Sequence, residues 1–301
     1  MLTASLAFST PADKPRWQRW LLFSPLARIV IFMALTWAAT KGLVIVLHAF
    51  GLTMKGASPV VVGWLQFALR AIPSLAAYLV LVHGIERRRP KELALRRAAP
   101  DGLTGVVAGT VLFSTVVGAL WLLGSYHVTG VNAQAAWLPA LLKAGLGAGI
   151  GEEIMFRGVL FRIVEEGLGT WSALVVSALF FGAVHISNPG ATLWSSAAIA
   201  IEAGLLFGMI YQVSRSLPLC MGVHAAWNFA QGTIYGIPVS GMAADGWLVS
   251  ARSGPDWLSG GVFGAEASVV ALALCTMCTL ALIGLAFRRR SIVAPAWRRR
   301  D

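Results

Sequence analysis

Long apolar runs separated by short polar connections are the dominant pattern of this chain. A helical run needs about 20 residues to cross the hydrocarbon core of a bilayer. Runs that approach or exceed this length cover residues 26–50, 59–84, 103–124, 136–164, 171–187, 193–213, 217–236 and 265–287. The pattern therefore predicts an all-α polytopic membrane protein, a bundle of about eight transmembrane helices.

The remaining residues divide around this bundle. Residues 1–25 form a polar N-terminal tail, residues 26–287 the transmembrane helical domain, and residues 288–301 a basic C-terminal tail. The longest connection, residues 237–264, is rich in Gly, Ser and Asp, and is either a plain surface loop or a lid over a site. We expect the plain loop, because most connections simply run over the surface. The spans leave no room for a separate soluble domain.

Composition supports a membrane protein, and charge orients it. Hydrophobic residues make up 57% of the chain and charged residues 12%, and the mean hydropathy is +0.73. The net charge of +11 comes from cations that cluster near residues 14–28, 87–97 and 288–300, next to the spans. Such clusters mark the cytoplasmic side of membrane proteins, so we expect both termini in the cytoplasm. They need no nucleic acid as a partner, and the lipid bilayer is the partner that composition implies.

Three ionisable residues lie close together in the fourth apolar run. A charge at the centre of a bilayer costs roughly 2.5–3.5 kcal/mol on insertion scales, so Glu152, Glu153 and Arg157 need pairing, water or a chemical role. Glu153 and Arg157 stand at i and i+4, with the acid nearer the N-terminus, and we expect them to pair. Glu152 points about 100 degrees away around the helix axis and remains free for chemistry.

Two later runs carry further polar residues. A break at residues 167–169 should turn the chain back, and it lies midway between Glu152 and His185, which predicts that these two lie at the same depth of an antiparallel pair. His224 and Asn228 share one face of the seventh run at i and i+4. His224 lies only about 10 Å from its own turn near Arg215, whereas Glu152 lies about 25 Å from residue 168. Three alternatives would reconcile these depths: a broken helix near residues 145–151, a hairpin that extends beyond the membrane, or a different number of membrane crossings.

Taken together, the motifs Glu-Glu-x-x-x-Arg at 152–157, Phe-x-x-x-His at 181–185 and His-x-x-x-Asn at 224–228 resemble the CPBP intramembrane protease family, also called the type II CAAX prenyl protease or Abi family. The resemblance covers residues 138–231, the protease-like core. The stretch Gly-Gly-x-Phe-Gly-x-Glu at 260–266 looks like bacterial members of the family. The resemblance implies an intramembrane endopeptidase that hydrolyses a membrane-associated peptide or protein substrate, and we expect it in a bacterial inner membrane.

The same resemblance implies roles for individual residues. Glu152 would act as general base toward a water that His185 positions, and His224 with Asn228 would stabilise the oxyanion. Glu153 and Arg157 would support the helix. The cofactor stays open: Glu152, His185 and His224 would also be the ligands of a divalent metal such as zinc, which would make the protein a metalloprotease, whereas a metal-free glutamate site is the alternative. A non-catalytic membrane chaperone, immunity or transport-associated protein that keeps the polar cluster for structure is the second functional hypothesis.

Arg70 and Glu202 are also ionisable residues within apolar runs. A structural ion pair is the simpler interpretation of these two, and a contact with substrate the more specific one. Cys275 and Cys278 lie at i and i+3 in the last run, without a His or a further Cys nearby, and are interpreted as packing residues. Neither pair contributes to the family motifs.

Overall fold

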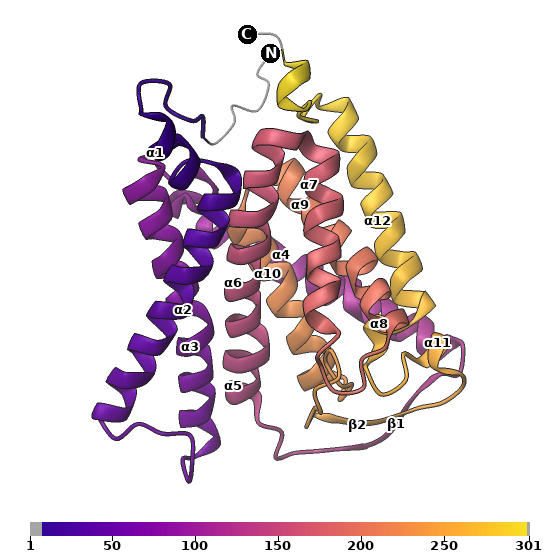
Figure 1. Cartoon of the computed structure of the whole chain (residues 1–301). Helices are drawn as coiled ribbons and strands as arrows, with labels where there is room; N and C mark the ends of the chain where they lie inside the picture. Colours follow the sequence, from indigo (N-terminus) through magenta and orange to yellow (C-terminus); the bar gives the residue numbers. More distant parts are fainter. Residues whose placement is uncertain (1–7, 300–301) are drawn as a thin grey trace.

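The computed structural model describes residues 8–299 and confirms the all-α polytopic bundle (Figure 1). Each expected span is helical. The corresponding helical stretches are α2 (Pro25–Ala49), α3 (Pro59–Val80) with η1 (Leu81–Ile85), α4 (Leu95–Leu122), α5 (Trp137–Ala140) through η3 (Leu141–Gly147) and α6 (Ala148–Glu153) to η4 (Ile154–Phe161), α7 (Arg162–His185), α8 (Leu193–Ile199) through η5 (Ala200–Leu205) to α9 (Leu206–Ser214), α10 (Leu217–Phe229) with η6 (Ala230–Ile234), and α12 (Val269–Arg288).

Six helical stretches within the described part of the chain are long and apolar enough to cross a membrane. One of them, Trp137–His185, contains two of the expected spans, while α10 with η6 is not among the six. Shorter elements connect or flank the long helices: α1 (Arg16–Leu21), η2 (Lys91–Leu93), β1 (Tyr126–Val131), β2 (Leu248–Arg252), α11 (Asp256–Ser259), η7 (Ala265–Ala267) and η8 (Ala296–Arg298).

The strands β1 and β2 form a small antiparallel ribbon that the apolar pattern does not predict. Tyr126 pairs with Arg252 and Val131 with Leu248, and the register shifts between Val128 and Gly130. The ribbon lies at the end of the bundle opposite α1 and η8 (Figure 1). A two-stranded ribbon is marginal without other support, and its strands are far apart in sequence, so its pairing had no local signal.

The expected break at residues 167–169 is confirmed at Gly169. This residue has φ 78° and ψ 174°, which interrupts α7 and turns the chain back. A Cβ atom here would lie 2.7 Å from the carbonyl oxygen of Val293, and Thr170 donates its backbone N–H to the same oxygen at 3.0 Å. The C-terminal tail therefore packs against this turn, and only glycine fits both the dihedral angles and the contact.

Helices α4 and α10 cross with their backbones in contact. A Cβ atom on Gly105 would lie 2.3 Å from the carbonyl oxygen of Leu219, and one on Gly222 would lie 2.3 Å from that of Gly102. Small residues at such crossings let membrane helices approach closely, since lipid gives apolar side chains no advantage in packing between helices. This crossing fixes the position of α10, which carries two of the candidate site residues.

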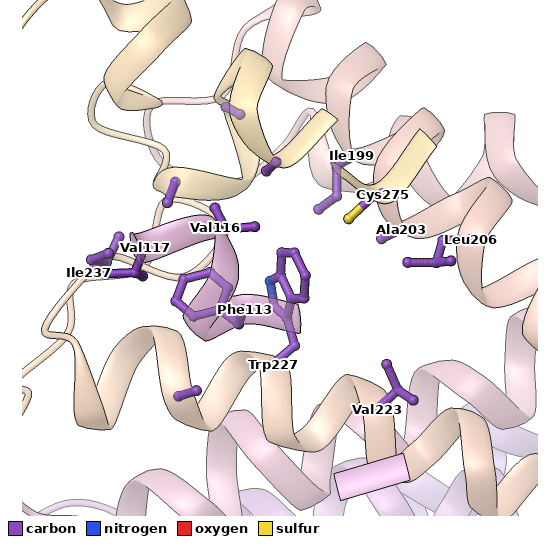
Figure 2. Packing of buried hydrophobic residues seen from close by; sticks show 14 of the residues in the cluster. Phe113, Val116, Val117, Ile199, Ala203, Leu206, Val223, Trp227, Ile237 and Cys275 are labelled. Carbon is purple, nitrogen blue, oxygen red and sulfur yellow. The ribbon is translucent and has the colours of Figure 1, made fainter. Parts of the chain in front are cut away.

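A large apolar cluster packs around Trp227 of α10 (Figure 2). Its ring meets that of Phe113 of α4 edge-on, with centroids 4.9 Å apart, and its Nε1–H donates to Gln231 at 3.0 Å. Ile199, Ala203 and Cys275 belong to the same cluster. The cluster thus joins α4, α10, η5 and α12 on one side of the candidate site.

A network of buried charges joins α2, α7 and the segment that follows η1. Arg28 pairs with Glu86 at 2.8 Å and with Glu166 at 2.5 Å, and Arg162 pairs with the same carboxylates at 2.9 and 3.0 Å. Burial opposes ionisation of Glu86, but Arg162, Arg88 and Arg28 together lower its pKa below the ordinary value. Some of the cations from which the orientation is predicted therefore also form buried ion pairs.

Candidate active site

Glu152 and Glu153 are adjacent residues of α6 that face different surroundings. The expected pairing of Glu153 with Arg157 is present, with 2.9 Å between Oε1 and Nη1, and both side chains are fully buried. Arg157 also donates from Nη2 to the carbonyl oxygens of Ala203 and Gly204 at 3.1 and 3.3 Å. This arginine therefore links α6 and η4 to η5, which agrees with the structural role expected for Glu153 and Arg157.

Glu152 instead faces a cavity of about 290 Å³. Its side chain is 29% exposed, and its Oε2 is buried without a hydrogen-bond partner among the described residues. His185, His224 and Asn228 line the same cavity. The structure thus brings together the four residues for which the sequence suggested a catalytic role.

His185 ends α7, and one of its ring nitrogens is committed to the helix. Nδ1 lies 2.7 Å from the carbonyl oxygen of Phe181, four residues earlier, and the two rings pack at an interplanar angle of 38° with centroids 4.8 Å apart. A carbonyl oxygen only accepts, so Nδ1 carries the proton and Nε2 is left with a lone pair. The Phe-x-x-x-His spacing therefore fixes the tautomer of the histidine.

His224 lies between the two glutamates of α6. Its Nδ1 is 2.8 Å from Oε1 of Glu153, and its Nε2 is 3.9 Å from Oε2 of Glu152. Glu153 is thus shared by Arg157 and His224. A histidine flanked by two carboxylates is favoured in its charged form, in which both nitrogens donate.

The depths of His224 and Glu152 agree because α10 begins part-way along its neighbour. Leu217, the first residue of α10, contacts Gly158 of η4, where a Cβ atom would lie 3.2 Å from Cδ1 of the leucine. Arg215 nevertheless reaches Glu165 at 2.5 Å with its long side chain. The helix around residues 145–151 is not broken; it continues through the π-helical turns η3 and η4 on both sides of α6.

The segment 237–264, for which we expected a plain surface loop, covers the cavity in its first part. Val239, Ser240 and Met242 line the cavity, and Asn188 donates to the carbonyl oxygen of Ser240 at 3.0 Å. Gln231 donates to the carbonyl oxygen of Pro238 at 2.6 Å. The expectation fails for this part because hydrogen bonds from two site helices hold the segment in place.

Residues 133–230 match the family model described as type II CAAX prenyl endopeptidase Rce1-like. This segment is thus similar to the Rce1-like family. It contains Glu152, His185, His224 and Asn228, and it confirms the resemblance drawn from the three motifs. A search of curated proteins finds no match to the chain.

The match supports a protease at the level of the family, and the six apolar helices support an integral membrane protein. A metal centre has no such support. Among residues 8–299, no group of three or more His, Cys, Asp and Glu side chains is placed to hold a metal ion. The three residues named as possible ligands line one cavity without forming such a group.

Other polar residues of the cavity lie outside the motifs. Arg70 and Glu202 both line it, but the expected ion pair between them is absent from the described part of the chain. Arg70 is exposed, whereas Glu202 is buried and accepts from the thiol of Cys275 at 3.5 Å. Lys143 and Glu266 complete the set of charged lining residues. An ionisable residue inside an apolar run was the available signal for Arg70, Lys143 and Glu202, and it does not specify a partner.

Proposed function

We propose that the protein is an intramembrane endopeptidase in which Glu152 activates a water molecule for attack on a peptide bond. The observation that supports this most strongly is the free Oε2 of Glu152, which faces a cavity shared with His185 and His224. A carboxylate oxygen that accepts no hydrogen bond is available to accept a proton. Glu153 also has a free Oε2, but it does not line the cavity, and its Oε1 contacts Arg157 and His224.

His185 would position the water for this attack. Its Nδ1 is held by Phe181, so its Nε2 offers a lone pair to one water hydrogen while Glu152 accepts the other. The two residues come from antiparallel helices on either side of the Gly169 turn. Fixing the water between them lowers the entropic cost of the attack.

His224 and Asn228 would stabilise the oxyanion that forms on the carbonyl. Nδ1 of His224 contacts Glu153, which leaves Nε2 to face the cavity. In the charged form of the histidine, Nε2 carries a hydrogen that can be donated to the oxyanion. Asn228 donates from Nδ2 to the carbonyl oxygen of Ala144 at 3.0 Å, which fixes its amide group beside the cavity. A second amide hydrogen remains for the oxyanion.

The proton balance of the reaction closes on Glu152. It takes a proton from the water as the oxygen bonds to the carbonyl carbon, and it returns that proton to the departing amine as the C–N bond breaks. The water oxygen ends in the new carboxylate. Zinc would supply a metal-bound water in such a site, but the side-chain arrangement offers no three-ligand group, and no step here depends on a metal.

The proposed orientation places the entrance to the cavity on the non-cytoplasmic side. A second cavity of about 290 Å³ shares Lys143, Ala144 and Asn228 with the first and extends to Pro59 and Asp245. The N-terminus of α3 lies at the end opposite α1 and η8 (Figure 1). If the cationic end is cytoplasmic, substrates enter from the opposite face.

Substrate trapping tests the proposed function. Membranes containing the parent protein or Glu152→Gln would be compared for co-purifying proteins and for new N-termini detected by mass spectrometry. We expect Glu152→Gln to retain one or more membrane proteins that the parent cleaves, and we expect a chelator to leave cleavage by the parent intact. Cleavage by Glu152→Gln at the parent rate would contradict the proposal and favour a non-catalytic role for the polar cluster.

A further inference from the structure

The Gly-Gly-x-Phe-Gly-x-Glu stretch at 260–266 is not used by the proposed mechanism, yet it delivers a carboxyl group to the same cavity. Glu266 in η7 is 2% exposed and lines the cavity together with Glu152. Its Oε1 has no hydrogen-bond partner among the described residues. A buried carboxyl oxygen without a hydrogen bond is costly, so its presence beside the candidate site calls for a reason.

The glycines of this stretch are required by its shape. Gly260 has φ 81°, and a Cβ atom on it would lie 1.9 Å from the carbonyl oxygen of Gly264. Gly264 has φ 126°, and a Cβ atom there would lie 2.2 Å from the carbonyl oxygen of Pro238. Larger residues fit neither position. The stretch therefore supports the segment that covers the cavity and sets the position of Glu266.

Glu202 is a second buried carboxyl group that lines the cavity. It is 2% exposed, as is Glu266. The thiol of Cys275 donates to Glu202 at 3.5 Å, and no cation within residues 8–299 forms an ion pair with either carboxyl group. A buried carboxyl group ionises readily only beside a cation, so both groups favour a cation that enters the cavity.

The rest of the cavity lining is of mixed character. Glu152, His224, Arg70 and Lys143 are its other charged or titratable residues. Apolar side chains, including those of Ile199, Leu206 and Trp227, line the same cavity. Such a lining suits a lysine or arginine side chain, because its methylene groups can contact the apolar residues while its charged group reaches a carboxylate.

We propose that Glu202 and Glu266 form an acidic subsite that binds a lysine or arginine side chain of the substrate. This inference rests on the proposed function, since it assigns specificity to the same cavity. An organic cation fits better than a metal ion, because the described residues contain no three-ligand group. The two carboxyl groups are specificity determinants, and they take no part in the proton transfers at Glu152.

Binding to the Glu152→Gln protein tests the subsite without requiring cleavage. Two series of apolar fluorescent peptides would carry a single lysine or a single norleucine, placed at a different position in each peptide. Their Kd values for the Glu152→Gln protein in nanodiscs would be measured at pH 8. Burial raises the pKa of Glu266 to about 7, although hydrogen bonds from Ser240 and Gln231 and the charge of His224 oppose this, so Glu266 is mostly ionised at pH 8. At the best position, we expect the lysine peptide to bind at least about tenfold more tightly than its norleucine partner.

The preference should disappear when the subsite is neutralised. Glu202→Gln and Glu266→Gln, singly and together, should bring the lysine and norleucine peptides to similar Kd values, whereas Asp256→Asn, an exposed residue outside the cavity, should keep the difference. Equal binding of the two peptides to the Glu152→Gln protein, or a lysine preference that survives in the double variant, would overturn the subsite. Absence of binding by every peptide would also count against it. Because no cleavage is measured, an inactive parent would contradict the proposed function alone.

Discussion

Glu153 and His224 are joined by a hydrogen bond of 2.8 Å between Oε1 and Nδ1, although 71 residues separate them in sequence. Glu153 does not line the cavity, so it acts on the reaction only through the histidine. The bond directs Nε2 of His224 toward Glu152 and favours the protonated form of the imidazole ring. Glu153 is therefore a positioning residue as well as the partner of Arg157.

Glu153→Gln should separate positioning from catalysis. We expect kcat to fall by about 10- to 100-fold, as seen when a residue that orients a reactive imidazole is changed, with little change in KM. The substrate would be one identified by trapping, and the kinetics would be measured in proteoliposomes. Glu153→Asp, which keeps the charge, should recover part of the rate. A parent-like kcat for Glu153→Gln would show that His224 does not need this partner.

The motif residues could be placed from the sequence because their spacing is local. Helical geometry alone pairs Glu153 with Arg157, and the glycine break relates Glu152 to His185. The contact between Glu153 and His224 could not be predicted, since it depends on where α10 begins relative to Gly158. Counting residues from a helix end gives the relative depth of two side chains only when both helices begin at the same depth in the membrane.

Residues outside the motifs were harder to assign. Glu266 gave no signal beyond the glycine pattern around it, because its burial depends on Pro238 and the covering segment. The sequence did not predict the pairing of Arg28 with Glu86 and Glu166, because the positive-inside rule was sufficient to account for an arginine at that position. A cation near a span end suits both an orienting and a structural role, and only the packed structure distinguishes them.

The buried charge network should contribute strongly to stability. Arg162→Ala would leave Glu86 and Glu166 each without one of their cations in a buried setting, and we expect a loss of about 3–5 kcal/mol. Arg97→Ala removes a pair with Asp101 in which the arginine is 61% exposed, and we expect a loss of at most about 1 kcal/mol. Unfolding in detergent would measure both. Equal, small losses would mean that the network is not structural.

The raised pKa of Glu266 predicts a dependence of stability on pH. The folded protein binds the proton of this carboxyl more tightly than the unfolded chain, so its contribution is fully present below the ordinary value of 4.5 and is lost as pH rises to about 7. Glu202, His224 and Cys275 face the same space, and comparison with Glu266→Gln isolates the one group. The Tm of Glu266→Gln should exceed that of the parent by more at pH 8 than at pH 5. A constant difference would contradict the assignment.

Cysteine labelling tests the orientation of the cavity. In a Cys278→Ser background, Asp245→Cys lies beside the second cavity and Arg290→Cys follows α12 at the opposite end. A membrane-impermeant maleimide added to intact cells should label Asp245→Cys, and should label Arg290→Cys only after permeabilisation. The reverse result would place the entrance in the cytoplasm.

The most direct test of the account is the rate at which Glu152→Gln cleaves a defined substrate. Purified parent and variant would be reconstituted in liposomes with a membrane protein identified by trapping, and the new carboxyl terminus would be quantified over time. The account predicts a rate at least about 10²-fold lower for Glu152→Gln, at unchanged Tm, because the general base is lost. Cleavage by Glu152→Gln at the parent rate would contradict it.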